Sequence, residues 1–144
     1  MTNILETFSN GLGISLVVFL PLVSAIFILF IPKTQEFLIK ITTLASSVVT
    51  FLLSLIVAYQ FDYDKAHTFQ LGNKLSWIES INSNYEIGID GISLPLLLLS
   101  TFISVLAIIY SFEHLPEPVN PKGMMSLILV LETGMNGTFV ALDL

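Results

Sequence analysis

The stretch that decides the fold of this 144-residue chain is GISLPLLLLSTFISVLAIIYSF, residues 91–112, in which 22 consecutive residues carry no charge. The hydrocarbon core of a bilayer is about 30 Å thick, and about 20 helical residues at a rise of 1.5 Å cross it. The stretch is therefore long enough to span a membrane. Because its apolar residues run continuously instead of alternating with polar ones, it predicts a helix and not a barrel strand.

Three further stretches have the same character. Residues 7–32 contain no charged side chain, residues 41–61 contain none, and residues 123–142 contain a single one, Glu132. Only helices and closed barrels satisfy their backbone hydrogen bonds inside lipid. The sequence therefore predicts an all-α membrane protein that forms a single domain over residues 1–144. Its four transmembrane helices are expected at about 12–31, 41–61, 91–112 and 123–142.

The composition agrees with a membrane protein and excludes several other classes. Hydrophobic residues make up 54% of the chain and charged residues 11%, whereas a soluble domain has roughly 25% charged residues. The chain has no cysteine, which excludes disulfide scaffolds and cysteine-ligated clusters. Its net charge of −6 comes without a basic cluster, so nucleic acid is not an expected partner and the lipid bilayer is.

The loops between the predicted helices carry an orientation signal. The two short loops, residues 32–40 and 113–122, hold three lysines, whereas the long loop, residues 62–90, holds two lysines and five acids. Lysines of short loops favour the cytoplasmic side. Both chain ends, and the N-terminus in particular, are therefore expected on the outer, positive side. Within the long loop, Gly72-Asn73 between two partly alternating runs predicts the turn of a short β-hairpin.

Several residues have expected structural roles in the helices. Asp90 and Ser93 are expected to cap the start of the third helix. Gly134 and Gly137 make one side of the fourth helix small, which favours close packing against a neighbouring helix. Pro21 is expected to bend the first helix or to leave one of its carbonyl groups free.

Glu132 is the candidate for chemistry, because it lies near the middle of the fourth predicted span. A carboxylate at that depth is costly, so the side chain must face a bundle interior, pair with another group or be protonated. Asn136 follows at i+4 on the same helix face. Three interpretations stay open: a neutral glutamic acid bonded to a neighbouring helix, a member of a proton path, or a ligand for a substrate or ion. Asp143, at the far end of the span, is a second proton-relay candidate.

Other kinds of site find no support in the sequence. His67 and His114 stand alone in loops, without the spacing of metal ligands. Neither a nucleophile elbow nor a phosphate-binding loop is present. We therefore expect no metal site and no catalytic residue.

Two strings carry a family resemblance: YEIGIDGISLPL at residues 85–96 and LETGMNGTFVALDL at residues 131–144. They resemble the third and fourth helices of the M-type subunit of respiratory complex I, called subunit 4 in mitochondria and chain M in bacteria. The resemblance implies the N-terminal part of an antiporter-like fold of about fourteen helices. Family members continue after this point, so the chain is expected to be a fragment that stops before the core proton-channel helices.

The resemblance also implies a function. The complete complex passes electrons from NADH or another reductant to a quinone and moves protons across a cell membrane or an energy-transducing organelle membrane. This chain would bind no redox cofactor itself, would have the other membrane subunits as partners, and would show no catalytic activity alone. Two alternatives stay open: a stand-alone four-helix transporter that uses Glu132 to couple transport to protons, and a non-catalytic membrane assembly protein.

Overall fold

The computed structural model describes residues 11–68, 70–78, 83–114 and 120–141. These described residues form four long helices, each apolar enough to cross a membrane, which confirms the predicted all-α membrane fold. Their bounds are α2 Gly13–Phe30, α3 Glu36–Gln60, α4 Ser93–Ser111 and α5 Pro121–Val140. A 3₁₀ turn, η2 at Tyr63–Lys65, and two strands, β1 at Gln70–Ile78 and β2 at Ser83–Ile89, fill most of the long loop.

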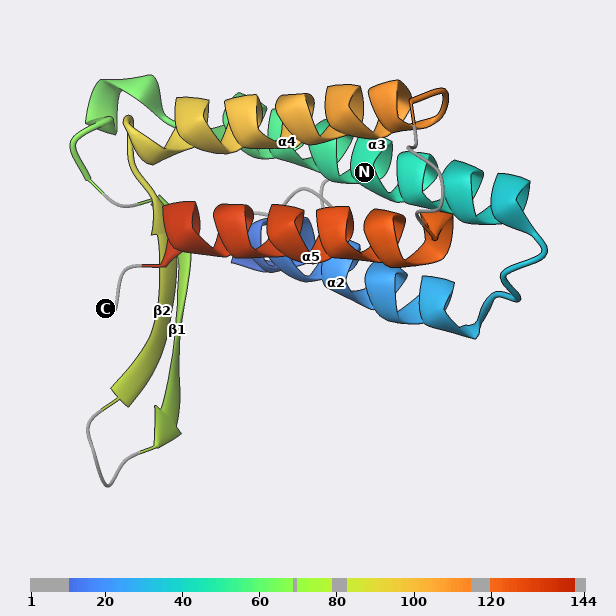
Figure 1. Cartoon of the computed structure of the whole chain (residues 1–144). Coiled ribbons are helices and arrows are strands. Elements are labelled where there is room, and N and C mark those ends of the chain that lie inside the picture. The colour runs from blue at the N-terminus through green and yellow to red at the C-terminus, as the bar shows by residue number, and fades with distance from the viewer. Residues whose placement is uncertain (1–10, 69, 79–82, 115–119, 142–144) are drawn as a thin grey trace, which may run out of the picture.

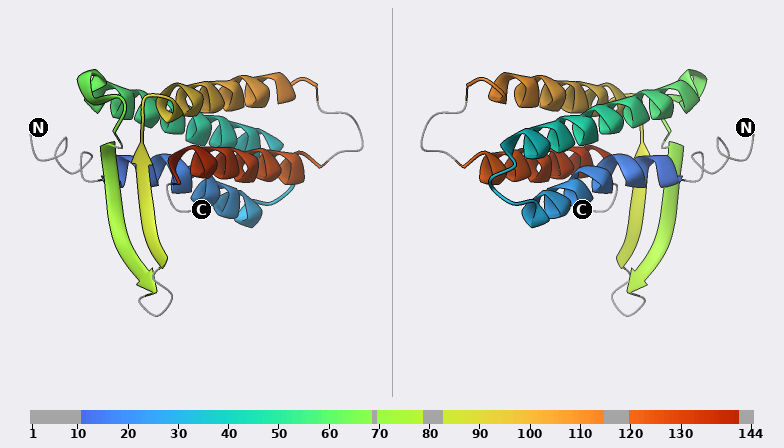
Figure 2. Two further views of the ribbon diagram at one scale, coloured as in Figure 1. Left: turned by 90° about the vertical axis from the view of Figure 1, so that its left-hand side faces the viewer. Right: turned by 90° about the vertical axis from the view of Figure 1, so that its right-hand side faces the viewer.

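The four helices form a bundle of two layers (Figures 1 and 2). Helices α3 and α4 make one layer and α2 and α5 make the other, and each helix packs against its neighbours around the bundle. Helices α3 and α5 also contact each other across the diagonal. This diagonal contact matters for function, because it brings the inner face of α3 to the inner face of α5.

Helix α3 begins five residues before the predicted start at residue 41, at Glu36. The charge of Lys40 suggested a loop, but the side chain of Lys40 extends to the end of the neighbouring helix, where Nζ donates to the carbonyl of Phe112 at 2.9 Å. Long lysine side chains near helix ends place their charge at the interface in this way.

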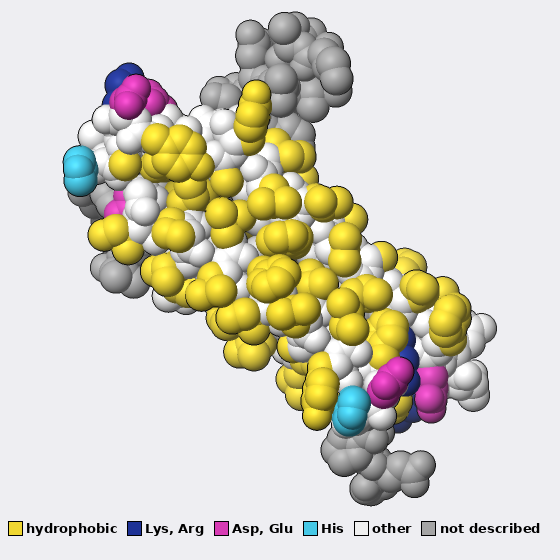
Figure 3. Space-filling model, turned by 90° about the horizontal axis from the view of Figure 1, so that it is seen from above, with side chains coloured by type: hydrophobic (Ala, Val, Ile, Leu, Met, Phe, Trp, Pro, Cys, Tyr) yellow, Lys and Arg dark blue, Asp and Glu magenta, His cyan; other side chains and the backbone are white. Residues whose placement is uncertain are grey.

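Charged side chains gather at the two ends of the elongated molecule, and the surface between them is largely hydrophobic (Figure 3). Exposed leucine, isoleucine, valine and phenylalanine side chains of all four helices make this belt. A lipid-facing surface has this distribution, since lipid tails are as apolar as these side chains.

The interior is divided along the bundle axis. One apolar cluster lies at the hairpin end and includes Ile14, Val57 and Leu97. A second lies at the opposite end and includes Ile28, Ile108 and Leu129. Between the two clusters, the buried side chains of α3, α4 and α5 are mostly polar. This polar layer is the feature from which the candidate site is built.

The predicted β-hairpin is present, but the prediction of its turn at Gly72-Asn73 is wrong. Both residues lie inside β1, which pairs antiparallel with β2. The register shifts from Gln70↔Ile89 to Asn73↔Ile87, so β1 holds one extra residue, and Leu71 has a positive φ of 55°. Glycine within a strand is typical of such a bulge. The Gly-Asn pair thus marks a bulge, and the strands reverse direction between Ile78 and Ser83.

Candidate functional site: a polar layer inside the helix bundle

Helix α5 supplies the centre of the polar layer with Glu132 and Asn136. The two side chains stand one helical turn apart on the face that α5 turns toward the other helices, and both are fully buried. Glu132 lies eleven residues after the start of α5 and eight before its end. The carboxyl group is therefore far from both membrane surfaces.

The Glu132 carboxyl group has one hydrogen-bond donor among the described residues. The hydroxyl of Ser47, on the diagonal helix α3, donates to Glu132 Oε1 at 3.2 Å. Glu132 Oε2 is buried and has no hydrogen-bond partner in the described part of the chain. The described residues form an ion pair between Lys65 and Asp62, but it is exposed at the hairpin end, away from Glu132. Among the described residues, Glu132 is thus a buried carboxyl group with one oxygen free and no cation to neutralise it.

Asn136 ties α5 to both remaining helices. Its Nδ2 donates to the carbonyl of Val17 on α2 at 3.3 Å, and its Oδ1 accepts from the hydroxyl of Ser100 on α4 at 3.2 Å. Val17 stands four residues before Pro21, which has no N–H to offer that carbonyl. The free carbonyl expected from Pro21 therefore exists, and Asn136 satisfies it.

Rows of hydroxyl groups flank the two central side chains. Helix α3 buries Thr43, Ser47, Thr50 and Ser54, and α4 buries Ser100, Thr101, Ser104 and Ser111. The hydroxyls of Ser54 and Thr101 meet at 3.1 Å between the two helices. These rows were not predicted from the sequence, although spacings of four, three and four residues along α3 follow one helix face. That periodicity of serine and threonine inside a span is the signal that finds them.

The start of α4 lies outside the polar layer, and the predicted capping pair meets there. Asp90 Oδ1 accepts from the backbone N–H of Ser93 at 2.7 Å and from that of Ile92 at 3.2 Å. The carbonyl of Asp90 accepts the first helical bond, from Leu94 N. Hydrogen bonds from the backbone and hydroxyl of Ser93 hold the pKa of the Asp90 carboxyl group below its usual 3.8. Capping bonds stabilise the charged carboxylate in this way.

Gly134 and Gly137 differ in their surroundings. A Cβ atom on Gly137 would lie 3.8 Å from Val18 Cγ1, an ordinary packing distance. A Cβ atom on Gly134 would meet no described atom within 4 Å. The expectation that Gly134 packs closely against another helix is therefore not met among the described helices, because this glycine lies on the outer face of α5.

Asp143 lies outside the described residues. No group of three or more histidine, cysteine, aspartate or glutamate side chains comes together in residues 11–68, 70–78, 83–114 and 120–141. His114 instead stacks on the ring of Tyr110, with ring centroids 4.2 Å apart.

The arrangement has a definite chemical capacity. A carboxyl group can take up and release a proton, and hydroxyl groups can both donate and accept hydrogen bonds. The layer joins one carboxyl group to a hydroxyl of α3 at mid-depth in a membrane protein, with further hydroxyls of α3 and α4 nearby in the same layer. Intramembrane ionisable groups in such settings mark ion or proton pathways.

Residues 16–135 match the family described as "NADH-ubiquinone oxidoreductase chain 4, amino terminus". The chain is 33% identical over 94% of its length to NAD(P)H-quinone oxidoreductase chain 4 of Prochlorococcus marinus (strain MIT 9313), of which it covers 24%.

Two further relatives come from other lineages. The chain is 34% identical over its full length to NADH-ubiquinone oxidoreductase chain 4 of Marchantia polymorpha, covering 28% of that protein. It is 30% identical over 91% of its length to NADH-quinone oxidoreductase subunit M of Rickettsia typhi (strain ATCC VR-144 / Wilmington), covering 27% of that protein. The chain thus spans about a quarter of the length of the curated relatives it matches.

Proposed function

Since this chain belongs to the family of the amino-terminal part of NADH-ubiquinone oxidoreductase chain 4, we propose that it forms the amino-terminal helices of a membrane subunit of a proton-translocating NAD(P)H-quinone oxidoreductase. It is a multi-pass membrane protein, and its proposed partners are the other membrane subunits of that complex. Electrons pass from NADH or another reductant to a quinone elsewhere in the complex. The chain itself binds no redox cofactor and takes part through proton transport.

The observation that carries the proton-transport role is the polar layer around Glu132. The carboxyl group is fully buried, accepts a hydrogen bond from the Ser47 hydroxyl of α3, and has one oxygen without a partner among the described residues. An unpaired charge is costly at this depth. The Glu132 side chain is therefore stable there when it is protonated, and its ionised form needs a transient proton or cation beside it. We assign Glu132 the role of a proton carrier, and Asp143 that of a second relay candidate from its sequence position.

The orientation proposed for the chain places its N-terminus on the outer, positive side of the membrane. Lys33 lies between α2 and α3, Lys40 in the first turns of α3, and Lys122 at the start of α5. These element ends lie at the end of the bundle opposite the hairpin (Figure 1). An excess of lysine in short loops favours the cytoplasmic side. The hairpin and the acidic residues around it then lie on the outer side.

The proton-carrier role is tested with Glu132→Gln in the complete complex, assayed in native membrane vesicles for quinone reduction and for proton uptake. Glutamine keeps the size of the side chain and can still accept from Ser47, but it cannot carry a proton. We expect both activities to fall by more than half while the complex still assembles. Glu36→Gln, at the exposed start of α3, is the matched control and should behave as the wild type.

Glu132→Ala separates this role from a structural one. If Glu132 only holds α3 and α5 together, Glu132→Gln should pump protons at the wild-type rate, and Glu132→Ala should lower only the amount of assembled complex. That combination would overturn the proton-carrier role. Membership of the complex is tested separately, by whether this chain co-purifies with quinone reductase activity.

A further inference from the structure

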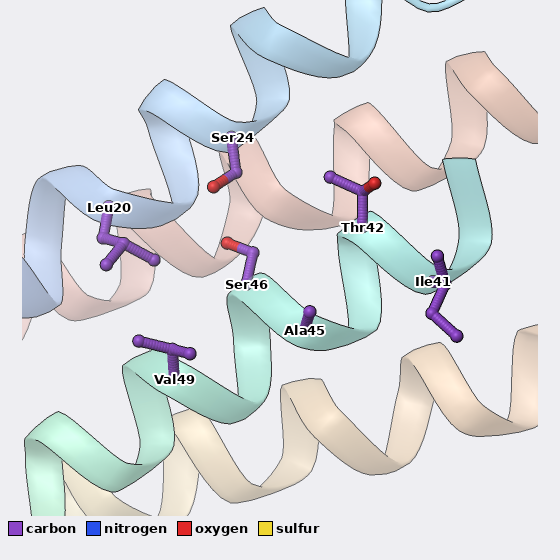
Figure 4. Close-up of a pocket in the computed structure, with 7 residues that line it drawn as sticks. All are labelled: Leu20, Ser24, Ile41, Thr42, Ala45, Ser46 and Val49. Atoms are coloured by element: carbon purple, nitrogen blue, oxygen red, sulfur yellow. The ribbon is translucent and has the colours of Figure 1, made fainter. Parts of the chain in front are cut away.

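A groove separates α2 and α3 on the outer surface of the bundle (Figure 4). Its volume is about 440 Å³. The lining residues are Leu20 and Ser24 on α2, and Ile41, Thr42, Ala45, Ser46 and Val49 on α3. Because Ile41, Ala45 and Val49 are exposed, the groove opens on the surface of the bundle.

Three hydroxyl groups line this groove, and none of them has a hydrogen bond to a described residue. Ser46 is 7% exposed, and its buried Oγ has no partner in the part of the chain that the structure describes. The hydroxyls of Ser24 and Ser46 point into the space between the two helices (Figure 4). Thr42 is the third of the group.

The free state of Ser46 contrasts with that of its neighbours. Serine and threonine hydroxyls inside helices can donate to a carbonyl of the preceding turn. Thr43 donates to Ile39 in this way, and Thr50 donates to the carbonyl of Ser46 itself. The hydroxyl of Ser46 does not turn back to its own helix. It is directed into the groove and is available to a partner there.

We propose that this groove receives a further transmembrane helix, supplied by the part of the complete subunit that extends beyond this chain in its relatives, and that this helix presents a serine, threonine, asparagine or glutamine side chain to Ser46. The relatives are about four times as long as this chain, so the complete subunit has additional helices to supply. The inference rests on the proposed function, because it requires that the chain is part of such a subunit.

A helix fits the groove better than lipid does. Hydrocarbon tails offer no hydrogen-bond donor or acceptor, so a lipid would leave all three hydroxyls unsatisfied. Small residues such as Ser24, Ala45 and Ser46 let another backbone approach closely, and helix association in membranes depends on such packing. The groove has no charged side chain, which favours a neutral polar group on the incoming helix.

The test places a photo-crosslinking benzophenone amino acid at position 45 in the assembled complex in native membranes. Ala45 lies in the groove and is exposed, so the probe reaches the occupant without displacing a buried side chain. The control is the same probe at Leu55, which is 43% exposed on the same helix and does not line the groove. Cross-linked peptides are identified by mass spectrometry.

We expect position 45 to cross-link to a later helix of the same subunit and position 55 not to do so. Adducts at position 45 with lipid only, or with a different subunit, would overturn the inference. In the same membranes, quinone reductase activity and co-purification report on the proposed function. If the complex is assembled and active but position 45 cross-links only to lipid, the helix proposed for the groove is wrong and the proposed function stands. If the chain is absent from the complex, both proposals are wrong.

A second measurement checks the hydrogen bond itself. Ser46→Ala should lower the cross-linking yield at position 45 by about threefold, the equilibrium effect of an average interhelical hydrogen bond in a membrane. Ser46→Thr keeps a hydroxyl and should restore the yield. Ser126→Ala is the matched control, because that hydroxyl donates to its own helix at Gly123. Equal yields in Ser46→Ala and the wild type would show that the occupant makes no such bond.

Discussion

Pro21 and Asn136 are far apart in the sequence and meet at one carbonyl group, that of Val17. Proline removes the N–H that would have bonded this carbonyl, and Asn136 Nδ2 replaces it at 3.3 Å. The same amide accepts from Ser100, so each half of the Asn136 side chain has a partner on a different helix. A kink-forming residue and a buried amide thus form one structural unit joining three helices.

A double-mutant cycle tests this unit. Asn136→Ala in the wild-type background leaves both the Val17 carbonyl and the Ser100 hydroxyl without a partner. In a Pro21→Ala background, the restored N–H of residue 21 bonds the Val17 carbonyl. Asn136→Ala should therefore lower the free energy of unfolding by less in this background than in the wild type. We expect a coupling of about 0.6–1.7 kcal/mol between the two sites, the range measured for hydrogen bonds between membrane helices. Resistance of the detergent-extracted protein to unfolding by SDS measures it.

The control for this cycle is Thr133, which is close in sequence to Asn136 but donates to its own helix at Leu129. Thr133→Ala should show no coupling to Pro21→Ala. Additive effects of Asn136→Ala and Pro21→Ala would contradict the shared carbonyl.

At the scale of elements, the start of α4 depends on a carboxylate and a close backbone contact. Asp90 satisfies the N–H groups of Ile92 and Ser93, and its negative charge lies at the positive end of the helix dipole. Gly91 N donates to the carbonyl of Ala66 at 2.9 Å, which fixes the turn after α3 against the start of α4. The segments that precede and follow the hairpin meet at this hydrogen bond.

The Asp90 cap predicts a pH dependence of stability. Because the folded-state pKa of this carboxyl group is lowered below its usual 3.8, its contribution is fully present above that value. The contribution is lost as the pH falls through the lower folded-state pKa.

The test compares two variants of Asp90. Asp90→Asn retains a capping side chain without the charge, so the free energy of unfolding of this variant should not fall with this group's protonation at acid pH. Asp90→Ala should cost about 1 kcal/mol at neutral pH. Thermal unfolding from pH 7 to pH 3 measures both, and identical pH profiles for wild type and Asp90→Asn would exclude the effect.

Gly91 gives a second prediction at this point. A Cβ atom at Gly91 would lie 3.0 Å from both the Cβ and the carbonyl oxygen of Ala66, closer than ordinary contacts. Gly91→Ala should therefore destabilise the protein by about 1–3 kcal/mol, the usual cost of overpacking. Gly134→Ala, with open space around the added carbon, is the matched control and should have little effect on the same thermal unfolding curve. Equal losses for the two variants would show that the Ala66 contact is not responsible.

The elements differ in how far the sequence predicts them. The helices could be located because a charge inside lipid is costly, so the runs with at most one charge cover most of each helix, although α3 extends beyond its run to Glu36. Local signals were weaker: Gly72-Asn73 fits both a turn and a bulge, and strand pairing decides between them. The partners of Glu132 could not be named, since Ser47 lies 85 residues away and the pairing depends on the diagonal contact of α3 and α5.

At the scale of the whole molecule, the polar layer and the lipid-facing belt explain how four helices stay together. Lipid gives almost no hydrophobic drive for helices to associate, so packing and interhelical hydrogen bonds must supply it. The bonds of Ser47, Ser54 and Asn136 link all four helices near the middle of the bundle. Lysines support the end opposite the hairpin, where Lys122 Nζ donates to the carbonyls of Leu29 and Ile31 at 2.7 and 2.9 Å.

These lysines make the two ends of the molecule unlike, which leads to a prediction about orientation. The cation of Lys122 lies at the negative end of the α2 dipole, and that of Lys40 reaches the last turn of α4. The chain has no native cysteine, so single cysteines can report which end faces which side. Thr34→Cys marks the lysine end and His67→Cys the hairpin end, and both positions are exposed.

In sealed vesicles whose outer face is the outer face of the native membrane, a membrane-impermeant maleimide should label His67→Cys at once. It should label Thr34→Cys only after detergent opens the vesicles, because the lysine end is expected inside. Inverted vesicles from the same membranes should give the reverse pattern, which controls for any difference in thiol reactivity between the two positions. If Thr34→Cys is the variant labelled from the outer side, the hairpin lies in the cytoplasm and the proposed orientation is wrong.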